Sequence, residues 1–197
     1  MATRRPEVVL VRHGETEWSR TGKHTGSTDV PLTELGREQA TALGAALQGR
    51  EFALVLTSPL QRASQTCRLA GYGDVSQRRD DLREWDYGDY EGRTTPEVRE
   101  ERPGWTLWRG GVPGGETAAE VGVRADRVTE ELRSLAGDGA VFAHGHVLRV
   151  LAARWLGLEP NAGRLFALDT ATISVLGYER EASVIRIWNN STAVRVA

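Results

Sequence analysis

Short apolar runs alternate with helical patterns along most of this chain, and this alternation is the feature that most limits its fold. The apolar runs at residues 7–11, 53–57 and 140–143 predict buried strands. Helical patterns accompany them, one opening at 32–34, one over 60–70, one behind the capping box Thr117-Ala118-Ala119-Glu120, and one over 147–156. Residues 170–178 and 183–188 predict a closing hairpin. Strands that alternate with helices are typical of a layered α/β fold.

Residues 71–115 interrupt this regularity. The stretch carries nine glycines together with Pro96, Pro103 and Pro113. We expect it to pass over the edge of the sheet and wall a crevice, with one short helix near residues 96–102, because loops of this length in compact domains are usually functional. The whole chain, residues 1–197, is expected to form one domain, since 197 residues at 40% hydrophobic content suffice for a single full core.

The charge balance excludes some classes of partner. The net charge of −2 provides no basic field for nucleic acid or an anionic membrane. Cys67 is the only cysteine, so no internal disulfide forms. Residues 1–6 form a short basic lead rather than a signal peptide, and no stretch reaches the roughly 18 apolar residues that span a bilayer. We therefore expect a cytoplasmic protein.

Two of the predicted strands run directly into a histidine. Arg12-His13-Gly14 follows the first strand, and His144-Gly145-His146 follows the strand at 140–143. The carboxyl ends of strands in an open α/β sheet line its ligand crevice, so both histidines are expected to face one site. An arginine beside a histidine at such a place predicts a phosphate site with a built-in nucleophile, since guanidinium groups bind phosphate oxygens and a neutral imidazole can attack phosphorus.

Several further motifs occur in order between residues 9 and 149. They are Arg12-His13-Gly14-Glu15-Thr16 with Trp18, the Thr25-Gly26 turn before Pro31-Leu32-Thr33, Ser58-Pro59-Leu60 with Arg62 and Gln65-Thr66, Leu82-Arg83-Glu84 with Gly88 and Glu91-Gly92, and His144-Gly145-His146. Together they resemble the histidine phosphatase superfamily, in its phosphoglycerate-mutase-like branch. The resemblance implies a three-layer α/β/α fold, in which helices flank a mostly parallel central sheet, and a phosphohistidine intermediate.

The predicted catalytic roles combine chemistry with this resemblance. His13 is the nucleophile, and Arg12 and Arg62 clamp the phosphate, with Arg62 placed in the first turn of a helix. By its position and the resemblance, His144 donates a hydrogen bond to the transferring phosphoryl group and holds positive charge there. Glu84 occupies the family's acid position and would protonate the leaving oxygen. The nearby carboxylates remain competitors for that role: Asp80, Asp81, Asp86 and Asp89.

The substrate is expected to contact a wider set of residues. Besides the two arginines, these are Ser19, His24, Thr25, Gly26, Tyr87, Gly145 and His146. Arg109 is a candidate for a second phosphate, although a solvated loop arginine is an equally good interpretation. Trp85, Trp105 and Trp108 would stack on a substrate or, as is commoner for tryptophan, pack the loop.

A metal site is the first alternative, because His144 and His146 are also spaced like a pair of ligands. Metal sites of that kind need three or more convergent histidines or carboxylates, and only His13 and His24 remain in the chain. The arginines supply the positive charge that a metal would bring. No metal and no cofactor are therefore predicted.

Hydrolysis and mutase transfer would use the same site. The resemblance favours hydrolysis, because mutases of this kind carry a longer insertion over the mouth and a shorter one leaves phosphohistidine open to water. The motifs look most like sedoheptulose-1,7-bisphosphatase and actinobacterial broad-specificity acid phosphatase, so the expected substrates are small phosphorylated metabolites such as sugar phosphates and bisphosphates. A phosphoglycerate-mutase-type phosphotransferase and a catalytically idle binding protein remain alternatives. Apolar residues on the closing hairpin leave a homodimer possible.

Overall fold

The computed structural model describes residues 5–191, so the first four residues of the basic lead and residues 192–197 lie outside the described part. Its six-stranded sheet has the order β3-β2-β4-β1-β5-β6. The strands are β1 Val8–Arg12, β2 Leu54–Thr57, β3 Ser76–Arg78, β4 Gly139–Ala143, β5 Ile173–Glu179 and β6 Ala182–Asn190. Strands β1 to β4 are parallel, whereas β5 and β6 pair antiparallel as the predicted hairpin. The predicted α/β class with a mostly parallel sheet is confirmed.

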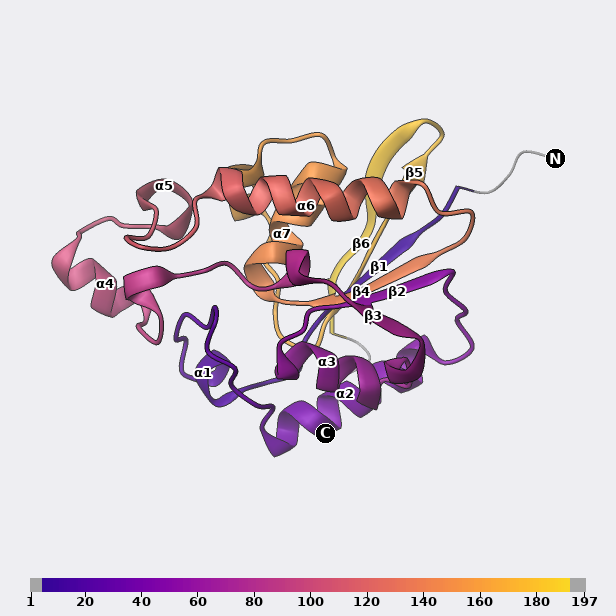
Figure 1. Cartoon of the computed structure of the whole chain (residues 1–197), viewed down its shortest axis with the longest axis horizontal. Helices are drawn as coiled ribbons and strands as arrows, with labels where there is room; N and C mark the ends of the chain where they lie inside the picture. The colour runs from indigo at the N-terminus through magenta and orange to yellow at the C-terminus, as the bar shows by residue number, and fades with distance from the viewer. Residues whose placement is uncertain (1–4, 192–197) are drawn as a thin grey trace.

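Helices cover both faces of the sheet (Figure 1). They are α1 Glu17–Arg20, α2 Glu34–Leu47, α3 Gln61–Leu69, α4 Thr95–Glu101, α5 Leu107–Gly110, α6 Ala118–Arg133 and α7 Gly145–Trp155, with the short 3-10 helices η1 Gly73–Val75, η2 Asp80–Leu82, η3 Gly88–Tyr90 and η4 Pro160–Leu165. Figure 1 shows α2 and α3 on one face, α6 and α7 on the other, and α4 and α5 beyond one end of the sheet.

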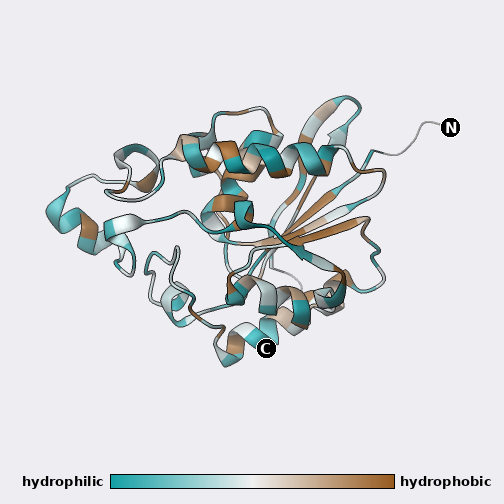
Figure 2. Ribbon diagram, viewed as in Figure 1, coloured by the Kyte–Doolittle hydropathy of each residue, from teal (hydrophilic) through white to brown (hydrophobic). Residues whose placement is uncertain are grey.

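Strand β1 explains why two helical layers form. Val9 and Val11 pack with α2 and α3, whereas Val8 and Leu10 pack with α6 and α7. Successive side chains of a strand point to opposite faces, so an uninterrupted apolar run needs cover on both sides. The apolar colouring of the central strands in Figure 2 reflects this double burial.

Threonine side chains define where several helices begin. The capping box predicted at Thr117 and Glu120 is present at the start of α6, and a second one opens α4 at Thr94. Thr33 caps α2 by accepting from the backbone N–H of Gly36. A capping side chain of this kind typically contributes about 1 kcal/mol, because it satisfies a backbone donor that has no partner within the helix.

The segment 71–115 contains more regular structure than the sequence predicts. Residues 76–78 form β3, an edge strand that pairs in parallel with β2. The sequence does not predict strand β3, because Ser-Gln-Arg contains no β-branched or aromatic residue and shows no apolar alternation. The predicted short helix is α4, and the segment also contains α5 and the 3-10 helices η1, η2 and η3.

No helix within residues 5–191 has both the length and the apolar character needed to cross a membrane.

Candidate active site

The register of β1 and β4 brings the two predicted histidines together. Arg12 pairs with Ala143, so the next residues, His13 and His144, leave adjacent parallel strands at the same edge. Their ring centroids lie 5.1 Å apart. A cavity of about 180 Å³ opens at this edge.

Most of the predicted substrate and catalytic residues line this cavity. They are Arg12, His13, Ser19, His24, Thr25, Glu84, Tyr87 and His146. The lining also contains Gly22 and Lys23, which the sequence analysis did not assign to the site. Lys23 could have been noticed as the only lysine of the chain, next to the assigned His24. Of the five carboxylates considered for the acid, only Glu84 borders this cavity.

His13 is held in the form that can act as a nucleophile. Its Nδ1 lies 2.7 Å from the backbone oxygen of Gly14, and because a carbonyl only accepts, Nδ1 carries the proton. The lone pair of the neutral ring is therefore on Nε2. Burial, reinforced by the charges of Arg62 and Arg12, lowers the pKa of His13 well below its usual range. The ring is thus neutral and nucleophilic at pH 7.

Arg12 has a donor that is not used within the protein. Its Nη1 donates to the backbone oxygen of Leu168, while its Nε is buried and has no partner among residues 5–191. A Cβ at Gly145 would lie 3.3 Å from Arg12 Cζ, so glycine there lets the guanidinium pack against the start of α7. A buried donor without a partner at the edge of an anion-sized cavity is suited to an oxyanion.

Arg62 does not line the His13 cavity but contacts the loop and the histidine beside it. It is fully buried, and its Nη atoms donate to the backbone oxygens of Thr25, Gly26 and Thr28 at 3.0 Å. The loop that carries the predicted contacts Thr25 and Gly26 is therefore fixed by Arg62. Glu91 holds the same loop, since its carboxylate accepts from the Gly26 N–H at 2.9 Å. Three of the five Arg62 N–H groups are directed to loop carbonyls and a fourth to a histidine, which leaves one for a ligand.

That histidine is His144, and its contacts correct one expectation. Arg62 Nε donates to His144 Nδ1 at 3.1 Å, so the single ring proton lies on Nε2, which donates to Ser58 Oγ at 2.7 Å. Burial, together with Arg62 and His13, lowers the pKa of His144 well below its usual range. These contacts contradict the predicted positive charge on His144, because the neighbouring Arg62 cation and the burial of the ring both favour the neutral form. The Nε2–H group remains a hydrogen-bond donor.

Glu84 closes the amino-terminal end of helix α7. Its Oε1 accepts from the N–H of Val147 at 2.9 Å and of Trp85 at 3.0 Å, and its Oε2 accepts from the N–H of His146 at 3.0 Å. His144, the N-cap residue of α7, makes no capping bond of its own. Glu84 therefore satisfies helix donors from a distant part of the chain while it faces the cavity.

A buried arginine fixes the backbone that carries Glu84. Arg124 of α6 donates to the backbone oxygens of Asp81, Arg83 and Glu84 at 2.8, 2.6 and 3.1 Å. Its Nε and Nη2 also form a two-pronged contact with the Glu116 carboxylate at 2.8 and 2.9 Å. All three nitrogens of this guanidinium are thus used to hold the loop that carries Glu84 against α6.

We expect Arg124→Gln to misplace Glu84. The substitution should lower the free energy of unfolding by about 2–3 kcal/mol, since it removes a nearly buried network and leaves Glu116 without its cation. Turnover of alkyl phosphates should fall more than turnover of aryl phosphates, because only alkyl leaving groups depend on a well-placed acid. Urea unfolding and the ratio of the two rates measure both effects.

Arg127→Gln is the matched control for this prediction. Arg127 lies on the same helix, and its side chain, 57% exposed, pairs with Asp81. Exposed pairs contribute about 1 kcal/mol at most, so this variant should keep both stability and the rate ratio. If the two variants behave alike, Arg124 does not position the acid.

Aromatic rings surround the mouth of the cavity. The hydroxyl of Tyr87 lies 2.6 Å from His146 Nδ1, and the ring of His24 packs on Tyr87 at 4.8 Å and on Trp105 at 5.6 Å. Burial raises the pKa of Tyr87 well above its usual range, so its hydroxyl keeps its proton while it is hydrogen-bonded to His146 Nδ1. The 3.9 Å separation of His146 from Glu84 is therefore not an ion pair, because burial also lowers the pKa of His146.

Of the two roles that the sequence left open for these tryptophans, stacking on a substrate or packing the loop, Trp105 and Trp108 have the second. Trp105 is buried and donates from Nε1 to the backbone oxygen of Gly111 at 2.8 Å, whereas Trp108 packs edge-on against the buried Trp85 at 5.5 Å. These contacts are loop packing. Arg109 lines a separate surface cavity of about 190 Å³ with Trp105, so the candidate second-phosphate contact does not border the His13 cavity.

The neutral histidines predict a dependence of stability on pH. The pKa values of His13, His144 and His146 are lowered by burial, so unfolding exposes rings that bind protons below pH 6.5. Stability is therefore complete above pH 6.5 and falls as the pH decreases, by up to about 1.4 kcal/mol per pH unit for each ring. The urea midpoint should drop clearly between pH 7 and pH 5.5, before the carboxylates titrate. An unchanged midpoint would contradict the assignment of three neutral rings.

The described residues were also compared with the ligand sets of metal sites. Among the described residues 5–191, no three or more His, Cys, Asp and Glu side chains are grouped so that they could hold a metal ion.

Comparison with known proteins gives concordant matches. The family profile described as "Histidine phosphatase superfamily (branch 1)" matches residues 8–191. The chain is 43% identical over 183 residues to an acid phosphatase of Mycobacterium tuberculosis, which covers 91% of this chain and 90% of the relative. It is 40% identical to the sedoheptulose 1,7-bisphosphatase of Saccharomyces cerevisiae, with 78% of this chain and 68% of the relative covered. The solved structure of a Mycobacterium tuberculosis open reading frame superposes with a TM-score of 0.89 at 40% identity, covering 94% of this chain and 98% of that one.

Proposed function

The chain belongs to branch 1 of the histidine phosphatase superfamily and is a phosphatase of that family; from this premise we propose that it hydrolyses phosphomonoesters of small metabolites, sugar phosphates and bisphosphates foremost, through a phosphohistidine on His13. The observation that carries the proposal is the bond from His13 Nδ1 to the Gly14 oxygen, which leaves the Nε2 lone pair free. The same cavity is lined by Arg12 and Glu84.

In the first step, the substrate phosphate enters the cavity as a dianion. The guanidinium of Arg12, whose Nε–H has no partner within the described residues, balances charge on its oxygens. His13 Nε2 then attacks phosphorus, an N–P bond forms and the bond to the leaving oxygen breaks. No metal is needed in this scheme, because the arginines supply the positive charge.

Glu84 supplies the proton for the leaving oxygen. Its Oε1 accepts two backbone N–H bonds and its Oε2 accepts one, so Oε2 has the free position for a proton. Protonated Oε2 gives this proton to the leaving alkoxide, which departs as an alcohol. In the second step the carboxylate takes a proton from water, whose oxygen attacks phosphorus as the N–P bond breaks. Inorganic phosphate and the original His13 are restored.

The preference for sugar phosphates rests on the relatives and on Lys23. The two curated relatives are named as an acid phosphatase and a sedoheptulose 1,7-bisphosphatase. Lys23 borders the cavity, and its ammonium, 5.8 Å from the ring centroid of Trp18, is a cation apart from the Arg12 guanidinium. A second phosphate on the substrate would find its counter-charge there.

The experiment is phosphate release in the presence of EDTA across a panel of sugar bisphosphates, sugar monophosphates and phosphoglycerates. Turnover concentrated on a bisphosphate would support the proposal in full, and weak activity spread evenly over the panel would support a generalist phosphatase. Conversion of 3-phosphoglycerate to 2-phosphoglycerate without phosphate release would replace hydrolysis with mutase transfer. No reaction with any compound would favour a binding protein on the same fold.

A further inference from the structure

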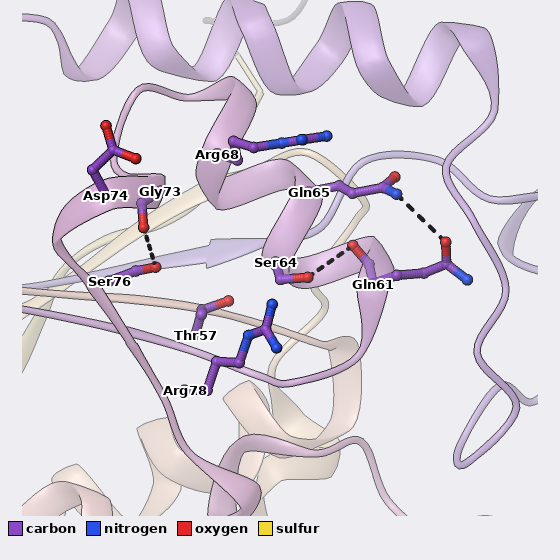
Figure 3. Close-up of a pocket in the computed structure, with 9 residues that line it drawn as sticks. All are labelled: Thr57, Gln61, Ser64, Gln65, Arg68, Gly73, Asp74, Ser76 and Arg78. Atoms are coloured by element: carbon purple, nitrogen blue, oxygen red, sulfur yellow. Dashed lines mark hydrogen bonds between the residues drawn. The ribbon is translucent and has the colours of Figure 1, made fainter.

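A second cavity, larger than the one at His13, is lined in part by helix α3 (Figure 3). Its volume is about 450 Å³, and it lies between α3, η1 and β3. None of its lining residues borders the His13 cavity. The catalytic scheme leaves it without a role.

Two of its lining residues are arginines without a partner. The side chains of Arg68 and Arg78 make no hydrogen bond or ion pair within residues 5–191. Within residues 5–191, two further arginine side chains have no hydrogen bond or ion pair, Arg109 and Arg180, and neither lines this cavity. Two free forked donors at one cavity are suited to phosphate oxygens.

The remaining lining is polar and rich in acceptors. The hydroxyls of Ser64 and Ser76 donate to backbone oxygens at 3.3 and 2.8 Å, so their own oxygens remain free to accept. Figure 3 shows the guanidinium of Arg78 directed toward Ser64, and Asp74 beside Gly73 at the far end. These acceptors match the hydroxyl groups of a polyol.

The charge at the cavity also favours an anion. Arg68 and Arg78 bring two positive charges and Asp74 one negative charge, which leaves a net charge of +1. A volume of about 450 Å³ exceeds what a phosphate alone requires and falls within the range of small-molecule sites. The cavity therefore offers guanidinium groups for a phosphate and serine hydroxyls for other polar groups of a ligand.

The cavity shares its supports with the catalytic residues. Residues 61, 64, 65 and 68 form the face of α3 toward the cavity, with the spacing of one helical stripe, whereas Arg62 is buried against His144. Thr57 in the cavity wall directly precedes Ser58, which accepts from His144 Nε2. A ligand in the cavity would thus contact the helix and the strand end that position the catalytic groups.

We propose that the cavity between α3, η1 and β3 is a second ligand site, which binds a phosphate monoester of a hydroxyl-rich metabolite through Arg68 and Arg78. This goes beyond the proposed hydrolysis, because the ligand is bound there and not cleaved.

Equilibrium dialysis with labelled inorganic phosphate tests the proposal. The unchanged protein should bind two phosphates per chain, one at His13 and one at the second site. The double variant Arg68→Gln/Arg78→Gln should bind one in the same concentration range, with phosphate affinity at the second site weakened by at least about tenfold. Binding at the second site should also weaken with salt, since its arginines are exposed.

Arg180→Gln is the matched control, since it removes an equally unpaired charge from the turn between β5 and β6. It should bind two phosphates, and all variants should retain their thermal midpoint. Equal numbers of phosphates on the unchanged protein and on the double variant would overturn the proposal. Failure of the proposed function at His13 would remove one phosphate from every protein alike and leave the difference between the unchanged protein and the double variant, so the two failures are distinguishable.

Discussion

Replacing His13 with alanine is expected to lower phosphate release by at least about 10³-fold. The variant lacks the Nε2 lone pair that carries the phosphoryl group in the proposed mechanism. His144 cannot replace it through Nε2, because that nitrogen bears a proton and donates to Ser58.

The measurement is phosphate release together with trapping of the phosphorylated protein. An alkaline quench preserves phosphohistidine, so substrate labelled at phosphorus should label the unchanged protein and not His13→Ala. The variant should remain folded, because removing a ring that is buried beside two arginines leaves no charge without a partner. Normal turnover in a folded His13→Ala protein would contradict the proposed mechanism.

Glu84→Gln is expected to slow the hydrolysis of alkyl phosphates by about 10²–10⁴-fold and that of aryl phosphates much less. An alkoxide is a strong base and must be protonated as it leaves, whereas a nitrophenolate is stable without a proton. The comparison is made within one variant, with a sugar phosphate and p-nitrophenyl phosphate as substrates. Equal losses on both would move the acid role to another group.

The structure adds a second expectation for the same variant. A glutamine offers one accepting oxygen where Glu84 accepts from three backbone N–H groups, and its own NH₂ group would face some of them. The free energy of unfolding should fall by about 1–3 kcal/mol, because helix donors are left without partners. Thermal unfolding should therefore accompany the rate measurements, since a loss of fold would lower both rates together.

The elements that the sequence predicted correctly depend on neighbours along the chain. The apolar run of β1, the capping box at Thr117 and the closing hairpin are local patterns, so they were visible without a structure. The meeting of His13 and His144 was also accessible, because parallel strands place their carboxyl ends at one edge. Strand β3 was missed, since an edge strand of three polar residues is specified by its pairing with β2 and not by its own pattern.

By itself, the sequence determined the layered α/β fold, the strand ends that carry the two histidines and the kinds of side chain available for phosphate chemistry. Only the tertiary structure decided how those side chains are used. Arg62 holds His144 in its neutral form from 82 residues away, and Glu84 caps a helix 63 residues further along the chain. Such contacts follow from packing between distant segments, and they determine which nitrogen is protonated and which donor is free. Local sequence patterns do not contain that information, because protonation and hydrogen bonding depend on which groups surround a side chain in the folded protein.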